Sequence, residues 1–133
     1  NLGISYRGLA KTEKAIDLIQ QALVIHREVG DRRGEGFDLD NLGHTYLKLG
    51  EARRTIEYCE QALTIHREIG DRRGQGFALW NLSRALNQLG ERAEAIKLAE
   101  ASLKIREEIE DQRAENIRKQ LAEWKEAQDG GSG

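Results

Sequence analysis

Residues 25–43 read IHREVGDRRGEGFDLDNLG, and residues 65–83 read IHREIGDRRGQGFALWNLS. Such a glycine-rich and charged phrase suits either a phosphate-binding loop or a structural joint. A phosphate-binding P-loop has the pattern G-x-x-x-x-G-K-[ST] and follows a β-strand. Here no Lys-Ser or Lys-Thr pair follows the glycines, and the flanking sequence has helical periodicity. The phrase is therefore interpreted as the end of one helix, a joint, and the start of the next helix.

The phrase belongs to a repeat with a period of 40 residues, because about half of the positions in residues 1–40 are identical to those in residues 41–80. A third copy begins at residue 81 and has diverged further. Self-similarity at a fixed period indicates supersecondary units that stack on one another. The composition favours helices, since charged residues make up 33% of the chain, aromatic residues only 5%, and proline is absent.

Glycines mark the predicted joints at twenty-residue intervals: Gly30, Gly50, Gly70 and Gly90. Glycine commonly ends a helix in the left-handed conformation, because it lacks the Cβ that makes that conformation costly. An acidic residue follows each glycine and suits a helix N-terminus, where Asp is a strong N-cap and Glu a weaker one. The spacing predicts helices of about 18 residues. Joints of about two residues make neighbouring helices antiparallel.

Apolar residues fall on one side of each predicted helix, at intervals of three and four residues. In the first helix of each unit they are Leu39, Leu42, Tyr46 and Leu49, then Leu79, Leu82, Leu86 and Leu89. In the second helix they are Ile16, Ile19, Ala22 and Leu23, then Ile56, Cys59, Ala62 and Leu63. Extra glycines at the helix starts, at positions 34, 36, 74 and 76, are expected to allow close approach to a neighbouring helix.

No pattern in the chain predicts catalysis, a cofactor or a bound metal. His26 and His66 share one repeat position, which favours a structural role, and Cys59 lies on an apolar stripe. No His-Glu-x-x-His motif or Cys/His cluster is present, and no Ser/His/Asp order stands out. We therefore expect a binding module and no enzyme.

Charge and cysteine content restrict the partners. The net charge of −2 provides no general attraction to nucleic acid or anionic lipid, so we expect neither as a partner. No apolar run approaches the ~20 residues of a membrane span. The single cysteine cannot form an internal disulfide, which fits a reducing, cytoplasmic compartment.

The repeat resembles the tetratricopeptide repeat (TPR). The resemblance is carried by Leu39, Leu42, Gly43 and Tyr46 in one helix, and by Thr55, Cys59 and Ala62 in the next. Residues 79–102 are similar to the same pattern more loosely. The usual TPR period is 34 residues, so a period of 40 is a longer variant. This variant resembles the repeats of kinesin light chains and of bacterial signalling proteins. The resemblance implies an all-α solenoid of antiparallel helix hairpins, a TPR superhelix, that acts as a protein-binding scaffold.

We expect a TPR array over residues 1–128, with a partial repeat in 1–30 and full repeats in 31–70 and 71–110. Residues 111–128 are predicted to form a capping helix, because Ala114, Ile117, Leu121 and Trp124 share one stripe while Lys119 and Glu126 replace apolar residues elsewhere. Residues 129–133 are interpreted as a flexible tail or an artificial linker.

The resemblance to the tetratricopeptide repeat implies a concave groove. In that family, the positions beside the packed stripe of the first helices line the groove. Those positions hold the candidate peptide-binding residues Asp40, Asn41, His44, Lys48, Trp80, Asn81, Arg84 and Asn87. Asparagines recur at 1, 41 and 81, and an amide can both donate to and accept from a peptide backbone. Local hydrogen bonds between helices are the alternative role. Trp80 suits a binding hot spot, and packing against the preceding first helix is its alternative.

The paired arginines at 32–33 and 72–73 fit either a solvated surface or a basic rim that contacts an acidic partner. At the N-terminal end, Leu2, Tyr6 and Leu9 lack a helix to cover them, so we expect self-association or another molecule on this uncapped edge. Two functions remain open: a scaffold that holds a peptide or protein segment in its groove, and a ligand-sensing or regulatory domain of a larger bacterial signalling protein.

Overall fold

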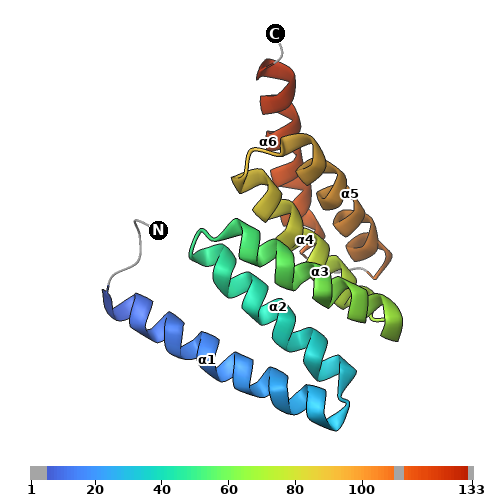
Figure 1. Ribbon diagram of the computed structural model, residues 1–133. Coiled ribbons are helices and arrows are strands. Elements are labelled where there is room, and N and C mark those ends of the chain that lie inside the picture. The colour runs from blue at the N-terminus through green and yellow to red at the C-terminus, as the bar shows by residue number, and fades with distance from the viewer. Residues whose placement is uncertain (1–5, 110–112, 132–133) are drawn as a thin grey trace.

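The computed structural model describes residues 6–109 and 113–131, and within them the chain forms six α-helices and no strand. The helices are α1 (Tyr6–Val29), α2 (Arg32–Lys48), α3 (Ala52–Ile69), α4 (Arg72–Gln88), α5 (Arg92–Glu108) and α6 (Ala114–Gly131). Each helix packs against the next in an antiparallel staircase, with α1 at one end and α6 at the other (Figure 1). The predicted all-α solenoid of helix hairpins is confirmed.

The core follows the predicted stripes. Leu39, Leu42, Cys59 and Ala62 are fully buried and form one cluster that extends along the array through Leu82. A second cluster joins the cap to the array and contains Ala95, Ala99, Ile117, Leu121 and Trp124. The apolar stripe of α6 therefore docks on the last repeat. The helix itself continues to Gly131, past the boundary predicted at residue 129.

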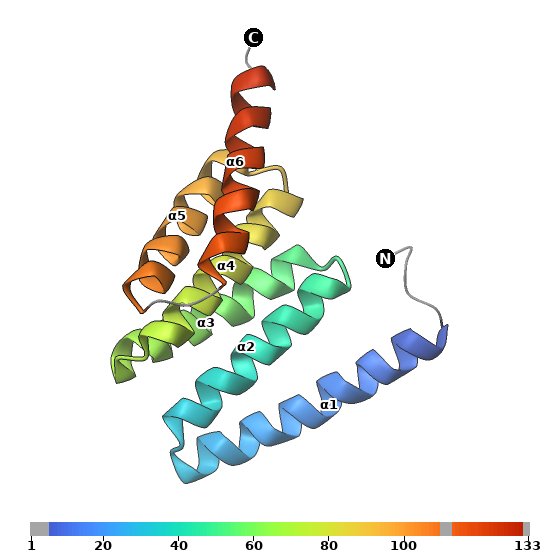
Figure 2. The same ribbon diagram turned by 180° about the vertical axis from the view of Figure 1, so that it is seen from behind.

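The first unit departs from the twenty-residue rhythm. Residues 1–9 align with the end of a first helix, yet α1 runs without a break from Tyr6 to Val29. The repeat position of Gly50 and Gly90 is occupied by Ala10, which favours helix continuation over a left-handed turn. Both views show α1 diverging from α2 away from their joint (Figure 2).

The four predicted joints are confirmed. Gly30, Gly50, Gly70 and Gly90 have φ values of 74°, 78°, 70° and 84°, in the left-handed region. The Asp31 side chain accepts a hydrogen bond from the Gly34 amide at 2.9 Å, and Asp71 accepts from Gly74 at the same distance. The two glutamates at the equivalent positions make no side-chain capping bond. Asp therefore caps the first helix of each unit, as expected.

The first arginine of each pair ties the two helices of its unit together. Arg72 Nη2 donates to Glu108 Oε2 at 2.7 Å, and Arg32 is bonded in the same way to Glu68. These four side chains are about half exposed, so the pairs add little free energy and mainly fix the register of the hairpin. Neither a solvated surface nor a basic rim is therefore a complete description of these arginines, because Arg32 and Arg72 have partners within the array.

His66 lies where three helices meet. Its side chain is only 3% exposed, and its Nε2 lies 2.7 Å from Asp40 Oδ2, with Nδ1 3.5 Å from Asp71 Oδ2. The ring occupies space that Gly74 leaves open, since a Cβ on Gly74 would lie 2.4 Å from Nδ1. Burial raises the pKa of Asp40, and the hydrogen bond to His66 opposes that rise. His66 is thus structural, as predicted, and Gly74 permits its position.

Replacing Gly74 with Ala should destabilise the array by about 1–3 kcal/mol, because the new methyl group would overlap the His66 ring. Gly76→Ala is the matched control. Its Cβ would meet Ile105 at an ordinary 3.4 Å, so helix propensity should leave stability unchanged or raise it by up to about 1 kcal/mol. Urea melts measure both changes. The Gly74→Ala cost should shrink in a His66→Ala background, and equal costs in both backgrounds would contradict the overlap.

Asp71→Ala should lower the free energy of unfolding by about 1 kcal/mol or more, because the cap of α4 and the contact with His66 are both lost. Glu91→Ala removes a side chain that makes no capping bond, and should cost less than about 0.5 kcal/mol. Paired urea melts compare the two variants. A cost for Glu91→Ala as large as that for Asp71→Ala would show that the hydrogen-bonded cap is not the cause.

Candidate functional site

Four of the predicted binding residues meet in one cavity of about 180 Å³, here named the α4 pocket. They are His44 from α2 and Trp80, Asn81 and Arg84 from α4. The rest of the lining is Phe77, Arg106, Arg113, Asn116 and Ile117. The pocket therefore joins α2, α4 and α5 to the start of the capping helix.

The other predicted residues lie outside this pocket. Asp40 lines a neighbouring cavity of about 430 Å³ that also includes Phe37 and shares Phe77 with the α4 pocket. Asn41 is half-buried on α2, Lys48 is exposed, and Asn87 is half-buried near the end of α4. The first asparagine of the ladder, at position 1, lies outside the described residues. The structure thus brings together half of the predicted set.

Asn81 forms the floor of the α4 pocket. Its side chain is only 1% exposed, and its amide nitrogen has no hydrogen-bond partner among the described residues. A buried N–H without a partner costs free energy that a ligand acceptor would recover. The Asn81 side chain also lies close enough to the His44 ring to raise the pKa of that ring.

Electrostatics at His44 favour its neutral form. Burial lowers the pKa of His44, and the positive charges of Lys48 and Arg84 lower it further, while the hydrogen bond with Asn81 acts in the opposite direction. The neutral ring adds no positive charge to the pocket at neutral pH. Its Nδ1 is buried and lacks a hydrogen-bond partner in the described structure, which leaves a second polar atom near the pocket floor.

Three arginines give the α4 pocket its charge. Arg84 and Arg113 are exposed, whereas Arg106 is fully buried, and no acidic residue is among the described residues of the lining. The sequence prediction included Arg84 and missed the other two. The 40-residue period contained the signal, because Arg106 occupies the repeat position of His66 and Trp80 that of Asp40. The His–Asp pair of one unit is replaced by an Arg–Trp combination in the next.

Trp80 packs on the capping helix. Its ring stacks on Trp124 with centroids 5.8 Å apart and an interplanar angle of 23°. Packing against the preceding first helix was the alternative role for Trp80, and the ring stacking that the structure shows is with the following helix. Trp80 remains half-buried and lines the pocket, so it both docks α6 and offers an apolar surface there. The cap is therefore part of the site.

Cys59 lies outside the α4 pocket. Cys59 is fully buried, and burial raises the pKa of its thiol, which keeps it in the unreactive protonated form. Within the described residues, no three His, Cys, Asp or Glu side chains gather in a way that could hold a metal ion. No helix among them is long and apolar enough to cross a membrane.

Trp124→Ala should release α6 and expose Trp80, because their stacking joins the cap to α4. The chain has two tryptophans, so this variant leaves Trp80 as the sole tryptophan, whose fluorescence is excited selectively over that of the three tyrosines. We expect greater quenching of its fluorescence by acrylamide than in Trp124→Phe, which retains an aromatic ring at the contact and also isolates Trp80. Identical quenching in the two variants would show that position 124 does not control the docking of α6.

Comparison with known proteins agrees with this architecture. Residues 37–108, more than half of the chain, match a family model described as Tetratricopeptide repeat, and residues 1–33 match a second model of the same description. The comparison with curated proteins finds no match. Repeats of this family are generally protein–protein interaction modules. With its repeated antiparallel hairpins and these matches, the chain belongs to the tetratricopeptide repeat family.

Proposed function

We propose that the chain is a protein-interaction module that binds an extended segment of a partner protein on the face formed by α2 and α4. The α4 pocket receives an acidic side chain of that segment with an apolar neighbour. The observation that carries this proposal is the buried Asn81 amide nitrogen, which has no hydrogen-bond partner among the described residues and lies in a pocket that Arg84 also lines. The module has no catalytic role in this proposal, and its free Cys59 is consistent with a cytoplasmic location.

An acidic group fits the chemistry of the lining. Guanidinium groups bind carboxylates through short, often bidentate hydrogen bonds that are about twice as strong as neutral ones. The Asn81 amide supplies a further donor at the floor, where solvent is excluded. Trp80 and Phe77 border the same cavity and offer apolar surface to the next ligand residue. The pocket volume of about 180 Å³ is of the size of a side chain, which supports recognition of one residue at a time.

The neighbouring cavity offers a hydrogen-bond acceptor where the α4 pocket offers donors. This difference would orient a bound segment along the groove. Asp40 lies there with Phe37, and its Oδ1 is buried without a hydrogen-bond partner among the described residues. A carboxylate oxygen accepts hydrogen bonds, so this cavity suits a donor group of the bound segment. Because the two cavities share Phe77, one extended segment could place a donor in the first and an acid in the second.

A regulatory role is the second candidate, in which the array senses a ligand within a larger signalling protein. It is favoured by the position of the α4 pocket, whose lining includes Arg113, Asn116 and Ile117 at the start of the cap. A ligand that contacts these residues and Trp80 together would change how firmly α6 docks. Such coupling requires a difference in ligand affinity between the docked and undocked forms.

The test is a set of labelled ten-residue peptides in which Asp or Glu precedes Leu, Phe or Trp, with Asn or Gln versions as ligand controls. We expect fluorescence anisotropy to show binding of acidic peptides and weaker binding of their amide versions. Arg84→Gln should raise the Kd of bound acidic peptides about 10-fold or more, since a charge-assisted hydrogen bond contributes about 1.5–3 kcal/mol. Asn41→Ala should weaken binding of all peptides, through lost contacts with the peptide backbone.

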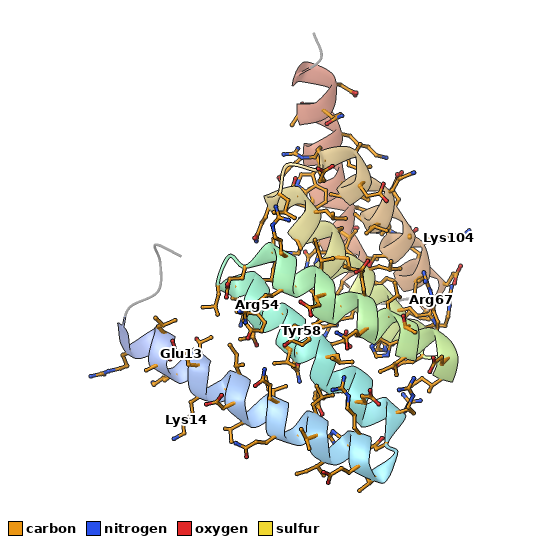
Figure 3. All side chains as sticks on the ribbon, viewed as in Figure 1. Glu13, Lys14, Arg54, Tyr58, Arg67 and Lys104 are labelled. Atoms are coloured by element: carbon orange, nitrogen blue, oxygen red, sulfur yellow. The ribbon has the colours of Figure 1, made fainter. Side chains whose placement is uncertain are left out.

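Arg67→Gln is the matched control, because Arg67 is exposed on α3 and does not line the pocket (Figure 3). Its Kd should equal that of the unmodified chain. Circular dichroism first confirms that each variant is folded. Absence of binding by every acidic peptide, or acidic-peptide affinities that are unchanged in Arg84→Gln, would reject the α4 pocket as an acid-binding site. An increase in Trp80 quenching when the ligand binds, measured in the Trp124→Phe variant, would support the regulatory candidate, because direct contact with a bound peptide would lower that quenching instead.

A further inference from the structure

The outer face of α1, formed by Leu18, Ile25 and Val29, is an apolar surface on the side away from the α2 core contact. All three side chains are exposed, and Ile25 is 57% exposed. The residues at its repeat position in later units, Ile65 and Ile105, are only 4% and 6% exposed. The same residue type at the same repeat position is therefore buried twice and open once.

The repeat shows what covers this position in the complete units. A Cβ on Gly36 of α2 would lie 3.2 Å from Ile65, and one on Gly76 of α4 would lie 3.4 Å from Ile105. In each case the first helix of the unit lies over the isoleucine of the second helix. Among the described residues, no helix occupies that place on α1. The outer face therefore corresponds to the surface on which a helix packs in the later units.

The opposite end of the array is a poor occupant. Stacking of one copy on another, end to end, would place the outward side of α6 on α1. That side carries Lys119 and Glu126 at the repeat positions of Leu79 and Leu86, and both are exposed. Burial of these two charges against the apolar outer face, where neither would have an ion-pair partner, would be costly. The cap thus disfavours an open chain of copies.

The outer face is instead complementary to itself. Lys14, Leu18, Gln21, Ile25 and Glu28 follow one another at intervals of four and three residues, so they share one side of α1. Lys14 points away from α2 (Figure 3). Neither Lys14 nor Glu28 forms an ion pair within the described part of the chain. In an antiparallel pair of α1 helices, both lie on the same flank and come to face each other.

We propose that two copies of the chain dimerise through antiparallel packing of their α1 helices about a two-fold axis near Gln21. Leu18 then packs on Ile25 of the second copy, and Lys14 pairs with Glu28 of the second copy. The two-fold axis repeats each contact, as an isologous interface requires. α1 has 24 residues and is about 36 Å long at 1.5 Å per residue, so the interface is narrow and the dimer reversible.

This dimer leaves the α4 pocket free, because α1 and the pocket lie toward opposite ends of the array. The proposal therefore stands or falls independently of peptide binding. The experiment is sedimentation equilibrium of the full chain over a range of concentrations from about 1 µM to about 1 mM. We expect a concentration-dependent monomer–dimer equilibrium. A monomer at every concentration would overturn the proposal and assign the outer face to another chain or segment.

Ile25→Glu should raise the dimer dissociation constant about 10-fold or more, because it places a charge in the centre of the contact. Leu89→Glu is the matched control, since Leu89 is an exposed apolar residue at the end of α4. It should leave the dissociation constant unchanged, and circular dichroism confirms that both variants are folded. A dimer that persists in Ile25→Glu, or that is lost in Leu89→Glu, would place the interface elsewhere.

Charge reversal tests the antiparallel register. Lys14→Glu alone and Glu28→Lys alone should each weaken the dimer, because each creates two repulsive pairs across the axis. A mixture of the two single variants should form a heterodimer with a dissociation constant near that of the unmodified chain, since one Lys14–Glu28 pair is kept and the other is restored with reversed sign. Failure of the mixture to associate more tightly than either variant alone would reject the pairing of Lys14 with Glu28.

Discussion

The contact between the His66 ring and the first turn of α4 is the constraint on which the spacing of the array depends. The ring fits only because Gly74 has no side chain, and it is held there by Asp40 on one side and Asp71 on the other. Three helices of two units are thereby tied at one point. Ordinary apolar packing along the stripes then follows, because the helix ends have been brought to a defined separation.

Much of the fold could be predicted because its determinants are local. A left-handed glycine such as Gly70 and an N-cap such as Asp71 depend on a few consecutive residues, and the sequence shows them directly. The first unit could not be predicted in the same way. The repeat position of Gly50 and Gly90 holds Ala10 in the first unit, and one substitution at a glycine position is enough to let α1 continue.

The candidate site was predicted only in part, for a different reason. His44, Trp80, Asn81 and Arg84 lie at repeat positions that share one face, so a helical period brings them together. Arg106 and Arg113 join them from α5 and from the residues before α6, and no periodicity within one helix connects these elements. Likewise, a sequence pattern cannot show that the Asn81 amide nitrogen is buried without a hydrogen-bond partner among the described residues.

A regular repeat gives every unit the same surface, so a specific site requires that the repeat be broken. In the unit with His66, the buried His66 ring is paired within the protein with Asp40. In the next unit, Arg106 and Trp80 stand at these two positions, and the pairing chemistry of the core is replaced by a buried cation and an aromatic ring. The Trp80 ring then stacks on Trp124 of the capping helix. The same divergence that weakens the third copy as a repeat therefore provides its charge, its apolar wall and its link to α6.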